Sequence, residues 1–110
     1  MSKKIFIVYG HHDTQKSFNA SIRDTFIDEA KKLNHKIDLI NLHDEKPLPF
    51  FDGTGPNDQV LNYRKRLEES DVLFMISPCY NLRATAILEN WIDLTSVSYT
   101  HLRAHETVVY

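Results

Sequence analysis

Polar and aromatic side chains gather in residues 10–19 (GHHDTQKSFN), between an apolar run and an amphipathic segment. Ser17 and Asn19 lie where a helix is expected to begin, and a helix N-terminus offers free N–H groups and a partial positive charge. That combination suits a phosphate, although the same two residues are also common helix N-caps, and one residue can do both. The stretch is neither a Walker loop nor a GxGxxG fingerprint. It therefore predicts an N-cap, a phosphate-binding loop, or both.

Four other residues could take part in chemistry, but each has a simpler interpretation. His11 and His12 could bind a metal, yet no supporting carboxylate spacing lies nearby, and loop histidines are more often solvated. Cys79 could be a nucleophile, but no base is evident beside it. Trp91 could stack on a ligand, although its position on an apolar helical stripe favours the core. We therefore predict no metal site and assign no catalytic residue.

Composition limits the class of protein. The chain has 110 residues, 42% hydrophobic and 25% charged, which is ordinary for one globular domain. A net charge of −2 gives no reason to expect nucleic acid or an anionic membrane surface as a partner. The apolar run at 5–9 is too short for a membrane span or a signal peptide, and a single cysteine cannot form an internal disulfide. We expect a cytoplasmic protein without membrane insertion.

Helical and strand patterns alternate along the chain. Strands are predicted at 4–9, 36–42 and 71–76, the second at a sheet edge, and helices at 17–33, 58–70 and 85–94. The first helix has a stripe that ends at Leu33, with Asn34 as its stop. Such alternation predicts an α/β fold with a doubly wound parallel sheet. Residues 43–57 form a loop whose apolar members need cover; they are Leu48, Phe50 and Phe51.

Two long loops follow the two most apolar strands, at 10–19 and 77–85. Ligands of doubly wound sheets bind outside the carboxyl ends of the strands, where strand order reverses. If those strands are neighbours, both loops line one crevice.

With both loops placed, the chain resembles the flavodoxin-like NAD(P)H:quinone oxidoreductases over residues 4–94. The first match is a strand followed by Gly10-His11 and by Ser17-Phe18-Asn19 opening a helix. The second is 78–81 (PCYN) with the helix 86–93 behind it. Three positions depart from the family pattern: His12 and Thr85 each stand where the family usually has proline, and Glu89 replaces the usual lysine.

The resemblance implies a flavin cofactor, FMN or FAD. It assigns the phosphate and ribityl groups to His11, Ser17, Phe18 and Asn19. It assigns the flavin ring to Pro78, Cys79, Tyr80 and Asn81. The implied activity is two-electron reduction of a quinone-like acceptor with NAD(P)H as reductant, by a protein that is a homodimer when whole. Two alternatives stay open: an inactive fragment, or a non-enzymatic flavin-binding regulatory subunit of a membrane transporter that docks through Leu48, Phe50 and Phe51.

The end of the chain has a different character. The resemblance stops near residue 94, and residues 96–107 resemble one translated frame of a transposon-end adaptor used in sequencing-library preparation. We therefore expect 1–95 to be the N-terminal part of a flavodoxin-like flavin-binding domain and 96–110 to be a non-native tail without a partner strand. The helical spacing of His101 and His105 then carries no metal site. The expected sheet is incomplete, with the first three strands and their helices, and the strand at 71–76 becomes an edge.

Overall fold

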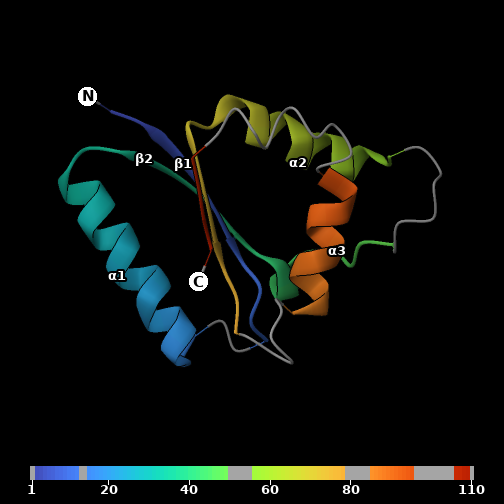
Figure 1. Cartoon of the computed structure of the whole chain (residues 1–110), viewed down its shortest axis with the longest axis horizontal. Helices are drawn as coiled ribbons and strands as arrows, with labels where there is room; N and C mark the ends of the chain where they lie inside the picture. Colours follow the sequence, from blue (N-terminus) through green and yellow to red (C-terminus); the bar gives the residue numbers. More distant parts are fainter. Residues whose placement is uncertain (1, 13–14, 50–55, 79–84, 96–105, 110) are drawn as a thin grey trace.

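The computed structural model describes residues 2–12, 15–49, 56–78, 85–95 and 106–109. In these ranges a parallel sheet lies between helix α1 on one face and helices α2 and α3 on the other (Figure 1). The elements in chain order are β1 (Lys4–Tyr9), α1 (Phe18–Lys32), β2 (Lys36–Asn41), the 3₁₀ turn η1 (Leu42–Asp44), α2 (Asp58–Glu69), β3 (Val72–Ile76), α3 (Ala86–Thr95) and β4 (Glu106–Val109).

The strand order is β2-β1-β3-β4, and every neighbouring pair is parallel. The predicted doubly wound α/β fold is therefore confirmed, with β2 at an edge as expected. The order reverses between β1 and β3, where Ile5 pairs with Val72 and Tyr9 with Ile76. The two loops singled out in the sequence thus leave adjacent strands at the same end of the sheet.

The number of strands differs from the prediction. Residues 106–109 form a fourth strand, β4, in which Glu106 pairs with Val72 and Val109 with Met75. The expectation that this part of the chain lacks a partner strand is wrong, and β3 is an interior strand rather than an edge. An apolar strand presents a full row of backbone donors and acceptors, and the β-branched run at 107–109 is suited to pair with them. Whether residues 96–110 belong to the native domain stays a prediction.

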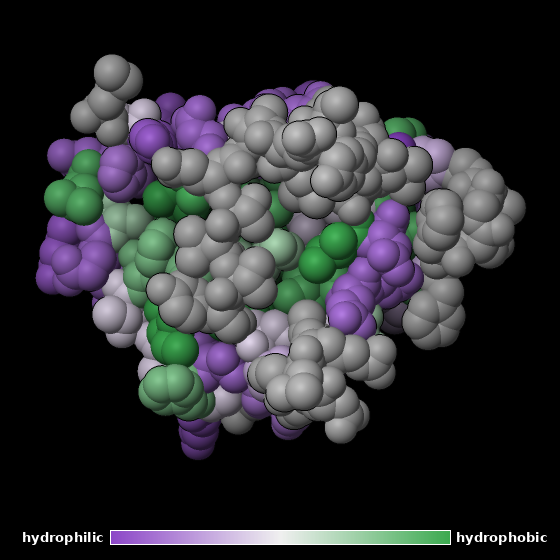
Figure 2. All heavy atoms as spheres, viewed as in Figure 1, coloured by the Kyte–Doolittle hydropathy of each residue, from purple (hydrophilic) through white to green (hydrophobic). Residues whose placement is uncertain are grey.

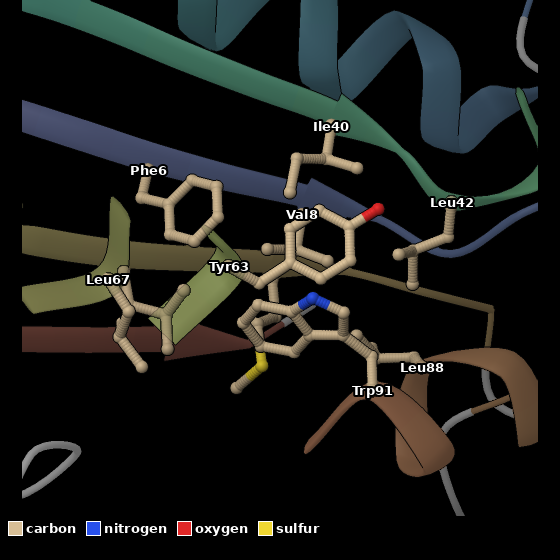
Figure 3. Packing of buried hydrophobic residues seen from close by; sticks show 10 residues of the cluster. Phe6, Val8, Ile40, Leu42, Tyr63, Leu67, Leu88 and Trp91 are labelled. Carbon is tan, nitrogen blue, oxygen red and sulfur yellow. The ribbon is translucent and has the colours of Figure 1, made fainter. Parts of the chain in front are cut away.

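One face of the sheet is closed by a buried cluster under α2 and α3, which we call the α2/α3 cluster (Figure 3). Trp91 of α3 is fully buried and meets the ring of Phe6 edge-on, with the ring centroids 5.9 Å apart. The predicted core position of Trp91 is therefore confirmed. The cluster consists of Phe6, Val8, Ile40, Leu42, Tyr63, Leu67, Leu73, Met75, Leu88 and Trp91.

Polar contacts tie α2 to its surroundings. Arg66 makes a two-pronged ion pair with Asp38 of β2, and this pair raises the pKa of the Arg66 guanidinium. The Tyr63 hydroxyl donates a hydrogen bond to a carboxylate oxygen of Glu45, 2.8 Å away. Burial of the phenol and the hydrogen bond to Glu45 raise the Tyr63 pKa to about 12. Tyr63 is thus a neutral hydrogen-bond donor that links α2 to the segment after η1.

The other face is covered by α1 alone, and its buried side chains form the α1 cluster. The ring centroid of Phe26 lies 4.2 Å from that of Phe74 on β3, yet Phe26 itself is only half-buried. The buried members are Ile5, Ile7, Tyr9, Ala20, Ala30, Phe74 and Ile76. A shallow apolar groove of about 460 Å³ runs along this face, lined by Phe18, Ser21, Ile22, Thr25, Phe26, Glu29 and Phe74. Hydrophobic residues accordingly show at the surface beside α1 in Figure 2.

The end of α1 is set by Asn34, as predicted. Asn34 has a φ of 64°, in the left-handed region that asparagine tolerates better than most residues. Its N–H donates to the Lys31 carbonyl and the His35 N–H donates to the Ala30 carbonyl, each at 3.0 Å, which together make a Schellman motif. Leu33 departs from the predicted stripe: it is 67% exposed, because it is the C-cap and its backbone no longer follows the helix.

Candidate functional site

The loops after β1 and β3 meet at Gly10. Its N–H donates to the Ile76 carbonyl oxygen, 2.8 Å away, and so extends the pairing of β1 with β3 by one residue. A Cβ at this position would lie 3.0 Å from the Leu88 Cβ and 3.1 Å from the Thr85 Oγ1. Glycine is therefore needed for the close approach of α3 to the end of β1, a use of glycine that depends on its missing side chain.

Thr85 fastens the two loops together. Its hydroxyl donates to the Gly10 carbonyl oxygen, 2.8 Å away, and its N–H donates to the Ser77 Oγ at 3.0 Å. All of these groups are buried, where a satisfied hydrogen bond is strongly preferred to an unpaired one. The threonine that replaces the usual family proline thus brings two donors, a hydroxyl and an N–H, that proline lacks.

The N-terminus of α1 lies beside this junction and is capped by Ser17. The Ser17 Oγ accepts the Ala20 N–H at 3.0 Å, so the predicted N-cap is confirmed for Ser17. Asn19 is half-buried within the first turn and is not the cap. The first turn contains no acidic residue, so the partial positive charge of this helix end is not offset there. A hydroxyl and backbone N–H groups, with no acidic residue in the first turn of the helix, are a donor set that fits a phosphate.

The other predicted site residues are placed as follows. His11 is half-buried, and its ring centroid lies 6.2 Å from that of Tyr9 and 4.3 Å from that of His12, on which it stacks. Phe18 is 79% exposed at the start of α1. Pro78 is half-buried just after β3. The remaining three lie outside the described residues; they are Cys79, Tyr80 and Asn81.

One residue near the site, Arg23, was missed in the sequence. Arg23 is only 6% exposed, and its guanidinium carbon lies 4.7 Å from the centroid of the Tyr9 ring. Its Nη1 donates to the Asn41 Oδ1 at 2.8 Å, and its Nε pairs with Asp24 at 2.9 Å. Arginine in an amphipathic helix ordinarily indicates a solvated face, and nothing in the local pattern marks Arg23 as buried.

A second concave surface, besides the groove along α1, is lined by residues of η1, of the segment after it, of α2 and of α3. It is a cavity of about 240 Å³ lined by Leu42, Glu45, Lys46, Pro47, Leu48, Tyr63, Ala86, Ile87 and Asn90. Leu48 packs against the α2/α3 cluster, as an apolar loop residue should. Leu48 thus contributes to the packing of the domain. Phe50 and Phe51 lie outside the described residues.

Within the described ranges, no three histidine, cysteine or acidic side chains converge in a way that could hold a metal ion. No helix in the part of the chain described here has both the length and the apolar character needed to cross a bilayer.

Comparison with known proteins gives a consistent picture. A family model described as flavodoxin-like fold matches residues 3–107. A human ribosyldihydronicotinamide dehydrogenase [quinone] is 27% identical, with 83% of this chain and 50% of that protein covered. An FMN-dependent NADH:quinone oxidoreductase from Clostridium perfringens is 28% identical, with 89% and 56% covered. The chain thus spans about half the length of these curated relatives.

Solved structures show the same fold. An NAD(P)H:quinone oxidoreductase from Methanothermobacter marburgensis superposes with a TM-score of 0.81 at 20% identity, over 99% of this chain and 63% of that one. A flavoenzyme NAD(P)H:(acceptor) oxidoreductase from Paracoccus denitrificans gives 0.78 at 20% identity, over 97% and 59%. With the family model matching nearly the whole sequence, the chain belongs to the flavodoxin-like fold family.

Proposed function

We propose that the protein to which this chain belongs is a flavin-dependent oxidoreductase that transfers two electrons from NAD(P)H to a quinone or a similar acceptor. The observation that carries the proposal is the junction at the β1/β3 switch point. There, Gly10, Thr85 and the Ser17-capped end of α1 come together outside the carboxyl ends of two parallel strands. The names of the curated relatives, which are quinone-reducing dehydrogenases, support this function.

In this proposal the phosphate and ribityl groups of the flavin, FMN or FAD, are held by His11, Ser17, Phe18 and Asn19. The flavin ring is held by Pro78, Cys79, Tyr80 and Asn81. When bound, the flavin supplies a ring that exchanges electron pairs with nicotinamide and acceptor. The contribution of this chain is to bind and orient that ring. We further propose that the whole protein acts in the cytoplasm as a homodimer.

The electrostatics of the α1 end support the phosphate assignment. The helix is 15 residues long, so its N-terminal partial charge is fully developed, and no carboxylate in the first turn competes with an anion. Ser17 adds a hydroxyl at the helix end itself.

A binding experiment tests the proposal. The purified chain is titrated with FMN while the quenching of flavin fluorescence is followed, and saturable binding is expected. Ser17→Ala should raise the Kd for FMN about tenfold to a hundredfold, because a hydrogen bond to a charged group contributes about 1.5–3 kcal/mol. Ser21→Ala is the matched control, since Ser21 is exposed one turn further along α1, and it should leave the Kd unchanged. Absence of flavin binding by the unaltered chain would contradict the assignment of the flavin site to these residues.

Turnover separates an enzyme from a regulatory flavoprotein. Oxidation of NADPH or NADH with a soluble quinone, without any partner protein, is expected from the whole protein. A whole protein that binds flavin but transfers no electrons alone would favour the regulatory alternative.

A further inference from the structure

The cavity of about 240 Å³ that η1, α2 and α3 help to line is mainly apolar. An apolar cavity of about 150 Å³ is enough to hold benzene, so this one has room for an aromatic ring with a short substituent. None of its lining residues is among those assigned to the flavin. The apolar part of the lining comes from Leu42, Pro47, Leu48, Ala86 and Ile87.

The segment after η1, which forms one wall of the cavity, is held in place by hydrogen bonds from α2 and α3. The Gln59 Nε2 donates to the Lys46 carbonyl oxygen at 2.8 Å, and the Asn90 Nδ2 donates to the Pro49 carbonyl oxygen at 3.1 Å. Between these two points in the sequence, Leu48 packs against the α2/α3 cluster. The wall is therefore formed before any ligand arrives, which lowers the ordering cost of binding.

Glu45 brings a carboxylate to the lining, and half of that carboxylate is unused. Glu45 is half-buried, and its Oε1 accepts the Tyr63 hydroxyl at 2.8 Å. Within the described part of the chain, its Oε2 has no hydrogen bond or ion pair. The Tyr63 hydroxyl also accepts from the Gln59 Nε2 at 3.1 Å, and it lies on the side of the cluster where Leu42 is found (Figure 3). One oxygen of Glu45 is thus left to accept from a ligand.

Asn90 adds a second acceptor to the same lining. Because its Nδ2 donates to Pro49, its Oδ1 is the acceptor end of the amide, and this oxygen has no hydrogen bond to any described residue. Lys46 also lines the cavity, but it is exposed and makes no ion pair with Glu45. A carboxylate and an amide oxygen can only accept, so they suit a ligand with several N–H donors, and a primary ammonium has three.

We propose that this cavity binds a small aromatic primary amine in its ammonium form. The ring lies against the apolar lining, where its removal from water favours binding, and the ammonium donates to the Glu45 carboxylate. The opposite charge at a half-buried position selects a cation over a neutral molecule of the same shape. The site goes beyond the proposed function and does not depend on it, because the two sets of residues are different.

NMR titration of the purified, ¹⁵N-labelled chain with 2-phenylethylamine at pH 7 tests the proposal. Saturable shift changes are expected at the backbone N–H groups of Ala86, Ile87 and Asn90, which line the cavity. The matched neutral probe is 2-phenylethanol, which has the same ring and chain length but no charge. It should bind about fivefold more weakly, because hydrogen bonds to a charged partner are stronger than neutral ones.

Three variants locate the ligand and its charge. Glu45→Gln keeps an oxygen that can accept from Tyr63 but removes the charge, so it should raise the Kd of the amine about fivefold and leave that of the alcohol unchanged. Lys46→Gln is the matched control, since it removes a charge from the neighbouring residue, and it should not raise the Kd of the amine. Ala86→Leu adds bulk to the lining and should raise both Kd values.

The contrary outcomes are equally specific. Absence of saturable shifts in the unaltered chain, or unchanged Kd values in Ala86→Leu, would show that the cavity does not hold these probes. Equal Kd values for amine and alcohol, or a parallel rise of both in Glu45→Gln, would overturn the choice of a cationic ligand. A rise in the Kd of the amine for Lys46→Gln as large as that for Glu45→Gln would do the same. The FMN titration tests the flavin site separately.

Discussion

The two faces of the sheet are covered unequally. Under α2 and α3 the side chains of Trp91, Tyr63 and Phe6 are almost completely buried, whereas under α1 Phe26 stays half-exposed beside an open groove. The candidate phosphate site lies on the second, less closed face: Ser17 caps α1, and its Oγ lies 2.6 Å from the hydroxyl oxygen of Tyr9, a member of the α1 cluster. The densest packing of the domain and the residues proposed to bind the cofactor phosphate therefore lie on opposite faces of one sheet.

Trp91→Ala should have the largest effect on stability. Trp91 fills the centre of the α2/α3 cluster, and removal of a large buried aromatic side chain typically lowers the free energy of unfolding by about 3–5 kcal/mol. Urea unfolding followed by circular dichroism measures the loss, since the variant no longer has a tryptophan to report by fluorescence. A loss below about 1.5 kcal/mol would show that this cluster does not dominate stability.

Phe26→Ala is the matching change on the α1 face. Its ring contacts Phe74 but is partly in solvent already, so we expect a smaller loss, about 2 kcal/mol, in the same unfolding experiment. Losses of equal size for Trp91→Ala and Phe26→Ala would contradict the difference between the two faces.

Tyr63 gives the α2/α3 face a dependence on alkaline pH. Its pKa is raised from 10.0 to about 12, so the neutral phenol contributes its full stabilisation below pH 10. Between pH 10 and about 12 the unfolded state loses this proton and the folded state keeps it, so stability falls as the pH rises. Between pH 9 and pH 11.5, the free energy of unfolding should fall by roughly 1–2 kcal/mol more for the unaltered chain than for Tyr63→Phe. Identical pH dependence in the two proteins would show that Tyr63 does not carry this effect.

Deletion of residues 96–110 should have the smallest effect on unfolding. We propose that this segment is not part of the native domain, and its described strand adds only four residues to the sheet. The expected loss is below about 1 kcal/mol, with a larger effect on association, because deletion frees the apolar edge of β3. Chemical denaturation and light scattering measure the two quantities. A loss above about 2 kcal/mol, comparable to that of a buried side chain, would show that β4 is an integral strand.

The sequence patterns predicted most of the fold. The helices and the first three strands lie within two residues of their predicted ends, because apolar periodicity and the stop at Asn34 act locally. The fourth strand was missed, since pairing of β4 with β3 depends on backbone groups made available by the tertiary fold. Leu33 was predicted to be buried on the apolar stripe but is exposed, because the stripe alone does not show at which residue the helix ends.

The candidate site was predictable in part. Ser17 was identified as a cap because side chains that accept backbone N–H groups at helix starts form a small set. The junction of Thr85 with Gly10 joins residues 75 positions apart, and the burial of Arg23 depends on Tyr9 from another element. The spacing of residues in the sequence does not predict such long-range contacts. The assignments of Cys79, Tyr80 and Asn81 remain predictions.

The Thr85–Gly10 contact also has a consequence for the order of folding. Pairing of β1 with β2 joins residues that are 32 positions apart, as in Lys4 with Lys36, whereas pairing of β1 with β3 joins Ile5 to Val72. Closing the longer loop costs only about 0.6 kcal/mol per doubling of length, but contacts of greater sequence separation form more slowly. The β1–β2 unit is thus expected to assemble first, and the Gly10–Thr85 junction forms only after β3 and α3 have docked. A ligand that spans both loops would therefore recognise only chains in which this last, long-range step is complete.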